Sequence, residues 1–164
     1  MGKKQILTEE EIGLKLERLA YQIYENNLDQ KEIVLAGMQK RGYAIAEVLE
    51  KKIVKLSKAK IRLISINIDK RNPIDSSLSD TKKLDGKAIV IIDDVANSGR
   101  TLLYALNPFL NVIAKRIQIC VLVDRKHKSY PVCADYIGMQ LSTTVEEHIK
   151  VEIEKGKIKG AWIE

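Results

Sequence analysis

An α/β fold built on a largely parallel sheet is predicted by three observations. Short apolar runs rich in Ile and Val recur along the chain, which is typical of strands buried on both faces. Amphipathic helical stretches separate these runs, and that alternation favours a parallel sheet with helices on both faces. Paired charges follow two of the runs, at the edge where ligands bind in open α/β sheets. We expect the 164 residues to form a single domain.

The composition narrows the class of protein. Hydrophobic residues make up 45% and charged residues 30% of the chain, which predicts a soluble globular protein. The net charge of +6 fits an anionic substrate or a nucleic acid and does not choose between them. The N-terminus lacks a signal-peptide core and no apolar run is long enough to span a membrane, so we expect a cytoplasmic protein with no membrane partner. Two cysteines without C-x-x-C spacing argue against structural zinc or a disulfide framework.

The first half of the chain predicts two helices and two strands. Thr8 and Glu11 have the spacing of a capping box, and apolar residues then recur at helical spacing, which predicts a helix over residues 8–26. The run at 32–37 predicts a strand, and apolar residues between 44 and 53 predict a second helix. The β-branched run at 61–68 predicts the next strand.

The second half begins with a segment that has no strong pattern. Residues 69–86 contain Pro73, several serines and charges of both signs, which predicts a mobile loop acting as an active-site lid. We call it the lid segment. Strands are predicted at 88–92, 116–124 and 134–138, with a helix at 102–110. Residues 150–164 predict a small hairpin-like C-terminal cap.

The sequence that carries most of the chemistry is AIVIIDDVANSGRT, residues 88–101. It reads as a buried strand, two adjacent carboxylates (Asp93 and Asp94), a turn of small polar residues and a helix N-terminus. Unpaired amides and the helix dipole at such a terminus favour a phosphate, and Ser98 and Thr101 add hydroxyl donors. Because the acids suit neutral hydroxyls beside that phosphate, the pattern indicates a ribose 5-phosphate site.

A basic loop, which we call the Lys-Arg loop, lies between the strand at 32–37 and the helix that follows. Its sequence is GMQKRG, residues 37–42, which places Lys40 and Arg41 at the carboxyl edge of the predicted sheet. Two cations at this edge suit a pyrophosphate opposite the ribose phosphate. A surface pair of basic residues is the alternative interpretation.

Residues 88–101 resemble the phosphoribosyl-pyrophosphate (PRPP) loop of type I phosphoribosyltransferases. The segment LVDRKHKSYPVCADYIG, residues 122–138, resembles that of one branch of this family, the bifunctional pyrimidine-operon attenuation regulators with uracil phosphoribosyltransferase activity. Residues 37–42 look like the pyrophosphate loop of that branch, and residues 7–26 like its first helix. The resemblance implies the type I phosphoribosyltransferase fold, with a small hood or cap beside the main sheet.

The resemblance also implies roles for individual residues. Asp93 and Asp94 would meet the ribose hydroxyls, and Arg125 would contact the substrate. Lys40 and Arg41 would contact pyrophosphate or substrate, and the main chain at Ile149 would lie near the base. The 5-phosphate would be wrapped by Val95, Ala96, Asn97, Ser98, Gly99, Arg100 and Thr101. Mg²⁺ is the implied cofactor, held mainly by PRPP, with Asp93 or Asp94 as its candidate protein contacts and no dedicated protein site.

The function implied is a pentosyl transfer, in which uracil and PRPP give UMP and pyrophosphate in pyrimidine salvage. One alternative is an RNA-binding regulator of a pyrimidine operon that senses UMP, and another is a purine-specific transferase of the same fold. Glu17-Arg18 replaces the family's Thr-Arg pair, and the lid segment lacks its Tyr-Arg-Asp-Asp-like stretch; both departures fall on the RNA-binding parts. Asn97-Ser98 replaces an aromatic-Thr pair and keeps the hydroxyl. By analogy we expect a homodimer or a higher homo-oligomer.

Overall fold

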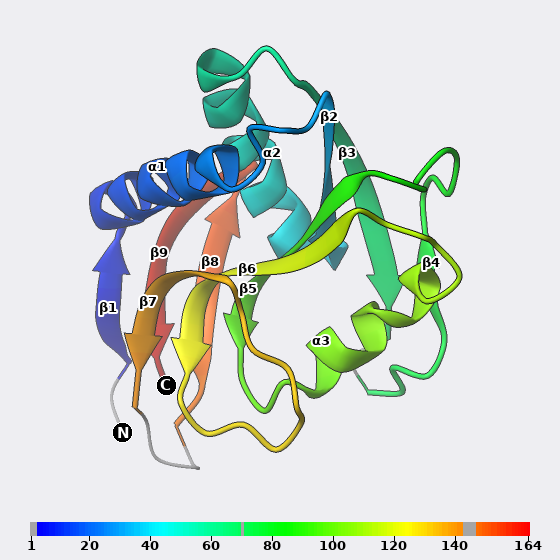
Figure 1. Cartoon of the computed structure of the whole chain (residues 1–164). Helices are drawn as coiled ribbons and strands as arrows, with labels where there is room; N and C mark the ends of the chain where they lie inside the picture. The colour runs from blue at the N-terminus through cyan, green and yellow to red at the C-terminus, as the bar shows by residue number, and fades with distance from the viewer. Residues whose placement is uncertain (1–2, 70, 143–146) are drawn as a thin grey trace.

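A computed structural model of the chain describes residues 3–69, 71–142 and 147–164, which form two sheets (Figure 1). The larger sheet has the order β4-β3-β2-β5-β6-β7. Its strands are β2 (Glu32–Met38), β3 (Lys60–Ile68), β4 (Ser76–Leu78), β5 (Ala88–Ala96), β6 (Arg116–Arg125) and β7 (Tyr136–Leu141). All of its pairs are parallel except that of β3 with β4. The predicted α/β class with a parallel-rich sheet is therefore confirmed.

The smaller sheet is antiparallel and has the order β1-β9-β8. Its strands are β1 (Lys4–Thr8), β8 (Ile149–Glu154) and β9 (Lys157–Ile163). We call this sheet the hood. It joins the two ends of the chain, because β1 pairs with β9.

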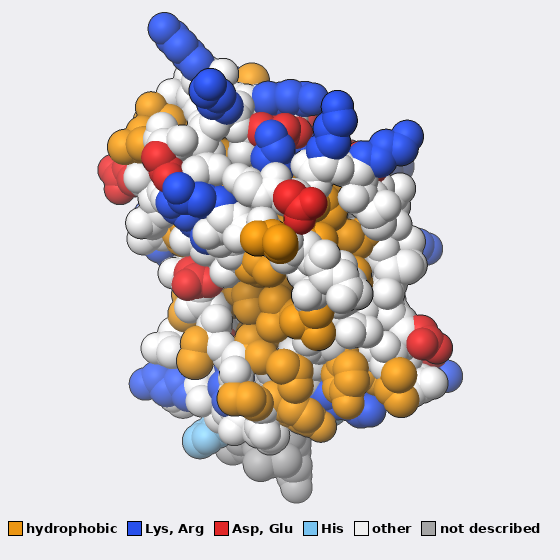
Figure 2. Space-filling model, turned by 45° about the vertical axis from the view of Figure 1, so that its right-hand side comes forward, with side chains coloured by type: hydrophobic (Ala, Val, Ile, Leu, Met, Phe, Trp, Pro, Cys, Tyr) orange, Lys and Arg blue, Asp and Glu red, His pale blue; other side chains and the backbone are white. Residues whose placement is uncertain are grey.

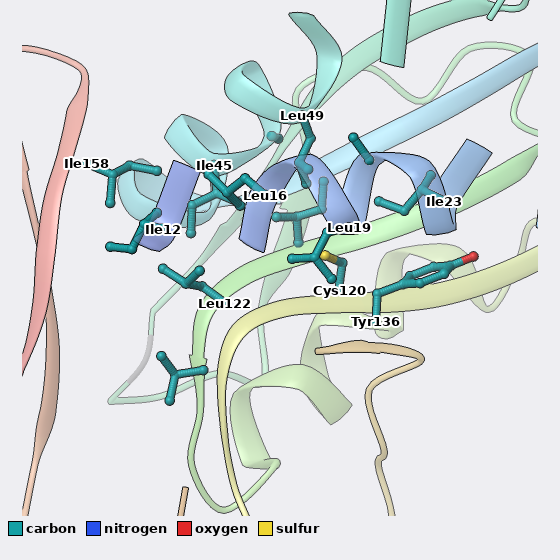
Figure 3. Close-up of a cluster of buried hydrophobic side chains, with 14 of the residues drawn as sticks. Ile12, Leu16, Leu19, Ile23, Ile45, Leu49, Cys120, Leu122, Tyr136 and Ile158 are labelled. Atoms are coloured by element: carbon teal, nitrogen blue, oxygen red, sulfur yellow. The ribbon is translucent and has the colours of Figure 1, made fainter. Parts of the chain in front are cut away.

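Helices cover both faces of the larger sheet. Helices α1 (Glu9–Glu25) and α2 (Gln39–Leu56) lie on one face together with the hood, while α3 (Arg100–Ala105) and the 3₁₀ helix η1 (Asn107–Phe109) lie on the other. Side chains alternate between the two cores: in β2, Ile33 and Leu35 pack under α1 and α2, whereas Val34 packs on the α3 side. Figure 3 shows the first core, where Leu16 and Leu19 of α1 meet Cys120 of β6.

Helix α1 forms as predicted, because its start carries a complete capping box. The Thr8 hydroxyl accepts a hydrogen bond from the Glu11 amide at 3.2 Å, and the Glu11 carboxylate accepts one from the Thr8 amide at 2.8 Å. The buried side chains of α1 recur every three or four residues. Each buried Leu or Ile contributes about 1.5–3 kcal/mol of transfer free energy, which fixes the helix on the sheet.

Several element boundaries differ from the prediction. Strand β5 continues through Asp93 and Asp94 to Ala96, and β7 begins at Tyr136 and ends at Leu141. The helix expected at 102–110 begins at Arg100, stops at Ala105 and continues as η1, because Pro108 disfavours α-helical geometry at the residue before it. Strand β1 was not predicted, since it buries only Leu7 and its partner lies at the other end of the chain.

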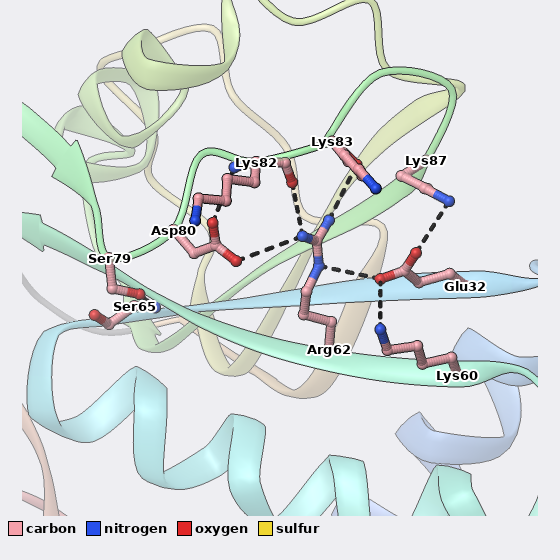
Figure 4. A network of polar contacts seen from close by, with 9 residues as sticks. All are labelled: Glu32, Lys60, Arg62, Ser65, Ser79, Asp80, Lys82, Lys83 and Lys87. Atoms are coloured by element: carbon pink, nitrogen blue, oxygen red, sulfur yellow. Dashed lines mark hydrogen bonds and ion pairs between the residues drawn. The ribbon is translucent and has the colours of Figure 1, made fainter.

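The lid segment is not a continuous loop. It contains β4, which pairs with β3 through Ile66 opposite Leu78 and Ile68 opposite Ser76. Its later part is fastened by Arg62, whose guanidinium donates to the carbonyls of Lys82 at 2.7 Å and Lys83 at 3.2 Å (Figure 4). Residue 70 of the lid segment lies outside the described residues. Closure of this segment over a ligand stays a prediction.

Glu32 lies at the centre of the same polar network. Its carboxylate is 3.1 Å from Arg62 Nε, 3.0 Å from Lys87 Nζ and 3.9 Å from Lys60 Nζ. Burial raises the pKa of Glu32, but the hydrogen bond from Lys87 and the positive charges around it prevail and hold this pKa below the usual 4.5. The network therefore stabilises the fold above that value and loses its contribution as the pH falls through the lowered pKa.

We expect Glu32→Gln to lower the free energy of unfolding by about 1 kcal/mol at pH 7, as for a partly buried ion pair. Urea titrations at pH 7 and at acidic pH measure the effect. The difference from the wild type should shrink as the pH falls from 4.5 through the lowered pKa of Glu32, below which both folded proteins carry a neutral group at this position. Glu25→Gln, on the exposed end of α1, is the matched control. A pH-independent difference would contradict this assignment.

Two smaller expectations can be compared with the structure. None of the helices in the described part of the chain is long and apolar enough to cross a membrane. Cys120 and Cys133 are both free thiols. Burial raises the pKa of the Cys120 thiol to about 12, so this thiol stays protonated and behaves as a small core side chain.

Candidate active site

The predicted phosphate loop, residues 95–101, lies at the carboxyl end of β5 and leads into α3. A small cavity of about 70 Å³ is lined by Asp93 and residues 95–102, which includes the whole predicted loop. Gly99 has φ of +85°, a left-handed conformation that glycine adopts without strain. The Ser98 hydroxyl accepts a hydrogen bond from the Arg100 amide at 3.3 Å. The loop therefore forms a compact turn that lines a cavity of about the size of one phosphate group.

The two acids stand beside this loop in the last part of β5. Asp93 and Asp94 are each only 2% exposed. The Asp93 carboxylate accepts a hydrogen bond from the Asp94 amide at 2.9 Å, and Arg41 Nη1 lies 3.5 Å from Asp94 Oδ2. The structure thus brings the acid pair, the phosphate loop and one cation of the Lys-Arg loop together at one edge of the sheet.

The Lys-Arg loop is not a loop in the structure, because β2 extends to Met38 and α2 begins at Gln39, earlier than predicted. Two glycines hold this segment close to β5. A Cβ atom on Gly42 would lie 2.3 Å from the carbonyl oxygen of Ile92, and one on Gly37 would lie 2.4 Å from the Cα of Tyr43. Gln39, between them, has φ of +44°, an uncommon conformation for a residue with a side chain. The first turn of α2 therefore packs directly against the strand that carries the acids, and this contact places Lys40 and Arg41.

Two larger cavities open on either side of Lys40 and Arg41. One, of about 790 Å³, extends toward β3 and β4 and is lined also by Tyr43, Ser65 and Asn67. The other, of about 530 Å³, lies between the same two cations and residues 150–154 of β8. Cavities of this size accept small organic ligands, so the Lys-Arg loop borders space on both sides that a nucleotide-sized substrate can fill.

Arg125 and Ile149 occupy different environments. Arg125 ends β6, and its Nη1 donates to Asn97 Oδ1 at 3.3 Å, so this arginine lies against the phosphate loop. Ile149 is 9% exposed and its side chain belongs to the core under α1 and α2. It begins β8, an edge strand of the hood. The side chain of Ile149 is therefore buried, and contact of its main chain with a base stays a prediction.

Asp124 and Lys128 are polar residues of this region to which the sequence interpretation gave no role. Asp124 is buried at the end of β6, and its carboxylate accepts hydrogen bonds from Lys128 Nζ and, at 3.4 Å, from Gln140 Nε2. The four-residue spacing of Asp124 and Lys128 was the signal available in the sequence, but such spacing is common on protein surfaces.

The left-handed backbone conformation of Gln39 was also missed, because no feature of the sequence indicated it.

Glu17, which departs from the family's Thr-Arg pair, and Arg18, which matches it, both make contacts within the protein. Arg18 donates to the carbonyls of Ile137 at 2.9 Å and Gly138 at 2.8 Å, at the edge strand β7. Glu17 lies 3.8 Å from Lys52 Nζ of α2. The Arg18 side chain is therefore engaged within the protein.

The donor set at the site suits a metal that its substrate carries. Within the described residues, no group of three or more His, Cys, Asp or Glu side chains is placed to hold a metal ion. The adjacent carboxylates of Asp93 and Asp94 are the candidate protein contacts for a metal ion. Mg²⁺ is commonly bound by one or two carboxylates together with substrate phosphates and water. The residues present therefore fit a magnesium ion delivered with a polyphosphate, and they do not form a closed metal cage.

Comparison with known proteins agrees with this geometry. A family model described as phosphoribosyl transferase domain matches residues 2–155. Among curated proteins, the chain is 32% identical over 162 residues to a bifunctional protein PyrR of Haemophilus ducreyi, covering 93% of this chain and 90% of that protein. It is 36% identical over 163 residues to one of Clostridium perfringens, covering 93% and 92%.

Solved structures show the same fold at lower sequence identity. A hypoxanthine-guanine phosphoribosyltransferase of Bacillus anthracis superposes with a TM-score of 0.77 at 20% identity, covering 98% of this chain and 99% of that one. A second structure of such an enzyme from the same organism gives a TM-score of 0.74 at 24% identity, covering 91% of this chain and 87% of that one. At these identities the match shows that the type I fold is shared.

Proposed function

This chain belongs to the phosphoribosyltransferase family, and from that premise we propose that it transfers the phosphoribosyl group of PRPP to uracil, forming UMP and releasing pyrophosphate. The observation that carries the proposal is the buried pair Asp93 and Asp94, which stands between a phosphate-sized loop and the cations of the Lys-Arg loop. A ribose that bears a phosphate at one end and a diphosphate at the other matches this order of groups.

Each part of the site takes one part of the substrate. The amides of residues 95–101, with the hydroxyls of Ser98 and Thr101, bind the 5-phosphate. Asp93 and Asp94 accept hydrogen bonds from the ribose hydroxyls, and Lys40 and Arg41 bind the diphosphate. Arg125, held against Asn97, contacts the substrate from the β6 side.

The transfer needs positioning and charge stabilisation more than a protein nucleophile. The bond between ribose C1′ and the pyrophosphate oxygen breaks, and a bond between C1′ and a ring nitrogen of the base forms. That nitrogen loses its proton to the departing pyrophosphate or to water. Positive charge grows on the ribose ring as the leaving group departs, and the proposed role of the two carboxylates is to stabilise it. Lys40 and Arg41 neutralise the negative charge that builds on pyrophosphate.

We propose Mg²⁺ as the cofactor. It enters with PRPP and is held mainly by the substrate, with Asp93 or Asp94 as the protein contact. When bound, it neutralises the charge on the diphosphate and so makes it a better leaving group.

The base is proposed to bind under the hood, beside β8. This strand is an edge of the hood sheet, and the cavity next to the Lys-Arg loop is lined by its residues 150–154. Main-chain donors and acceptors of an edge strand can read the edge of a uracil ring. The main chain at Ile149 begins this edge.

A panel of free bases tests the activity. The protein is incubated with PRPP, Mg²⁺ and uracil, cytosine, orotate, hypoxanthine, guanine or adenine in turn, and the nucleotide product and pyrophosphate are measured. We expect UMP from uracil and at least tenfold lower kcat/KM for the other bases, which is about 1.4 kcal/mol of discrimination. Product from a purine alone would replace uracil with the purine-specific alternative. No nucleotide from any base would refute the transferase proposal.

An RNA-binding regulatory role is a second candidate, and the distribution of basic residues favours testing it. Lys and Arg side chains crowd the upper end of the face in Figure 2, and β2 and β3 begin at the top of Figure 1. Lys60 begins β3, and Lys87 and Lys115 directly precede β5 and β6. Part of this charge is paired with Glu32 and Asp29.

Titration of a pyrimidine-operon leader RNA, with and without UMP and at several salt concentrations, measures this role. Binding that weakens steeply with salt and responds to UMP would support a regulator. Binding that is absent, or that does not depend on salt, would exclude it.

We further propose that the protein is cytoplasmic and forms a homodimer or a higher homo-oligomer. The sedimentation coefficient of the purified protein measures its oligomeric state.

A further inference from the structure

We propose that Lys128 is a positioning residue that holds the phosphate loop, residues 95–101, in the conformation that receives the 5-phosphate of PRPP; this inference rests on the function proposed above. Lys128 lies in the loop that follows β6 and is separate in sequence from the phosphate loop. The structure nevertheless places its side chain against that loop.

The ammonium group of Lys128 joins the ends of β5 and β6. Its Nζ donates to the carbonyl of Ala96 at 3.3 Å, which belongs to the phosphate loop. It also donates to the carbonyl of Arg125 and to the carboxylate of Asp124, which belong to the end of β6. Three acceptors from the two neighbouring strand ends thus share one cation, and the three donors of an ammonium match that number.

The residues that follow Lys128 make a second contact with the phosphate loop, at its middle. The amides of Ser129 and Tyr130 both donate to the carbonyl of Ser98, at 3.0 and 3.1 Å. The turn at Gly99 is close to the same segment: a Cβ atom there would lie 3.6 Å from Lys128 Cδ and 3.4 Å from the Tyr130 carbonyl oxygen. The aliphatic stem of Lys128 therefore packs against the turn while its ammonium reaches Ala96.

These contacts explain how a turn of small residues keeps one shape. A loop that binds phosphate through its amides loses affinity if the amides must be ordered at the moment of binding. Lys128 is bound to carbonyl and carboxylate oxygens of the protein, so it acts on the loop and not on the phosphate directly. Its side chain is 18% exposed and that of Asp124 is 8% exposed, so loss of the cation would also leave a buried carboxylate with weaker compensation.

The first experiment separates positioning from a general structural role. Lys128→Met is compared with Lys126→Met, which removes an exposed lysine two residues away. We expect Lys128→Met to raise the Kd and KM for PRPP by at least about tenfold, as for the loss of a charged hydrogen bond. The KM for the base at saturating PRPP should change less than about twofold, because β8 does not depend on this loop. Lys126→Met should match the wild type.

The second experiment does not need a ligand. Amide hydrogen exchange of the peptide that covers residues 96–102 is measured in the free protein, together with its thermal midpoint. Lys128→Met should exchange faster in this peptide, with β2 and β5 as protected as in the wild type. Lys128→Gln keeps a neutral donor toward Ala96 and provides the gentler variant if Lys128→Met does not fold; it should show the same acceleration to a smaller degree.

The outcomes are distinct. Faster local exchange and weaker PRPP binding in the folded variants support the proposal. Unchanged exchange with unchanged PRPP affinity overturns it, and so does an equal loss of affinity for PRPP and for the base. If the wild type itself binds no PRPP, the proposed function fails, while the exchange comparison still decides whether Lys128 orders the loop.

Discussion

Gly42→Ala is expected to disrupt both the fold and the site. The added Cβ would lie 2.3 Å from the carbonyl oxygen of Ile92 and 3.1 Å from the Cα of Asp93. Both are backbone atoms of the central strand β5, so no flexible side chain can move aside. The start of α2 must then shift away from β5, at a cost of about 3 kcal/mol or more, as for severe overpacking. Lys40 and Arg41 would move with it, so transferase activity should also be lost.

Gly13→Ala is the matched control, because it makes the same chemical change in a helix with space around it. Nothing lies within 4 Å of the position that its Cβ would take. Replacing a helical glycine with alanine should stabilise α1 by about 0.5–1 kcal/mol and leave kcat/KM unchanged. Chemical denaturation and the PRPP assay measure both variants. A Gly42→Ala protein with wild-type stability would show that α2 does not pack on β5 as closely as described.

Local chemistry made much of the candidate site predictable. In residues 88–101, a buried strand, an acid pair and a glycine turn follow one another directly, so their spatial order is their sequence order. Gly99 has the left-handed conformation that such a turn requires. The capping box of α1 is equally local and was equally predictable. Its two partners are three residues apart and form both expected hydrogen bonds.

The parts that were not predictable depend on distant pairings. Arg41 meets Asp94 across 53 residues of sequence, and the basic loop alone did not indicate which acid it would approach. The hood requires β1 to pair with β9, and β1 has too little apolar pattern to be recognised as a strand. In β5 the acids lie inside the strand, because β6 continues to pair beside them through Val123 and Asp124. The apolar run had indicated an earlier end.

The acid pair carries the other large expected effect. Asp94→Asn keeps the shape of the side chain and removes its negative charge beside Arg41. Because the proposed role is to stabilise positive charge that grows on the ribose, the loss should fall mainly on kcat. We expect kcat/KM for PRPP to fall by about a hundredfold, as for a charged hydrogen bond worth up to about 3 kcal/mol. Steady-state kinetics with uracil held at saturation measure this change.

Asp93→Asn should lower kcat/KM by a similar factor. In the double variant, kcat/KM should fall by less than the product of the two single factors, since the neighbouring acids act on one ribose. The control is Asp135→Asn, whose carboxylate accepts a hydrogen bond from the Ile119 amide at 2.7 Å near the opposite end of β6. This control shows whether the loss of a hydrogen-bonded carboxylate lowers kcat simply because the protein becomes less stable. Wild-type kcat in a folded Asp94→Asn protein would remove this acid from the reaction, and full additivity in the double variant would show that the two carboxylates act on separate groups.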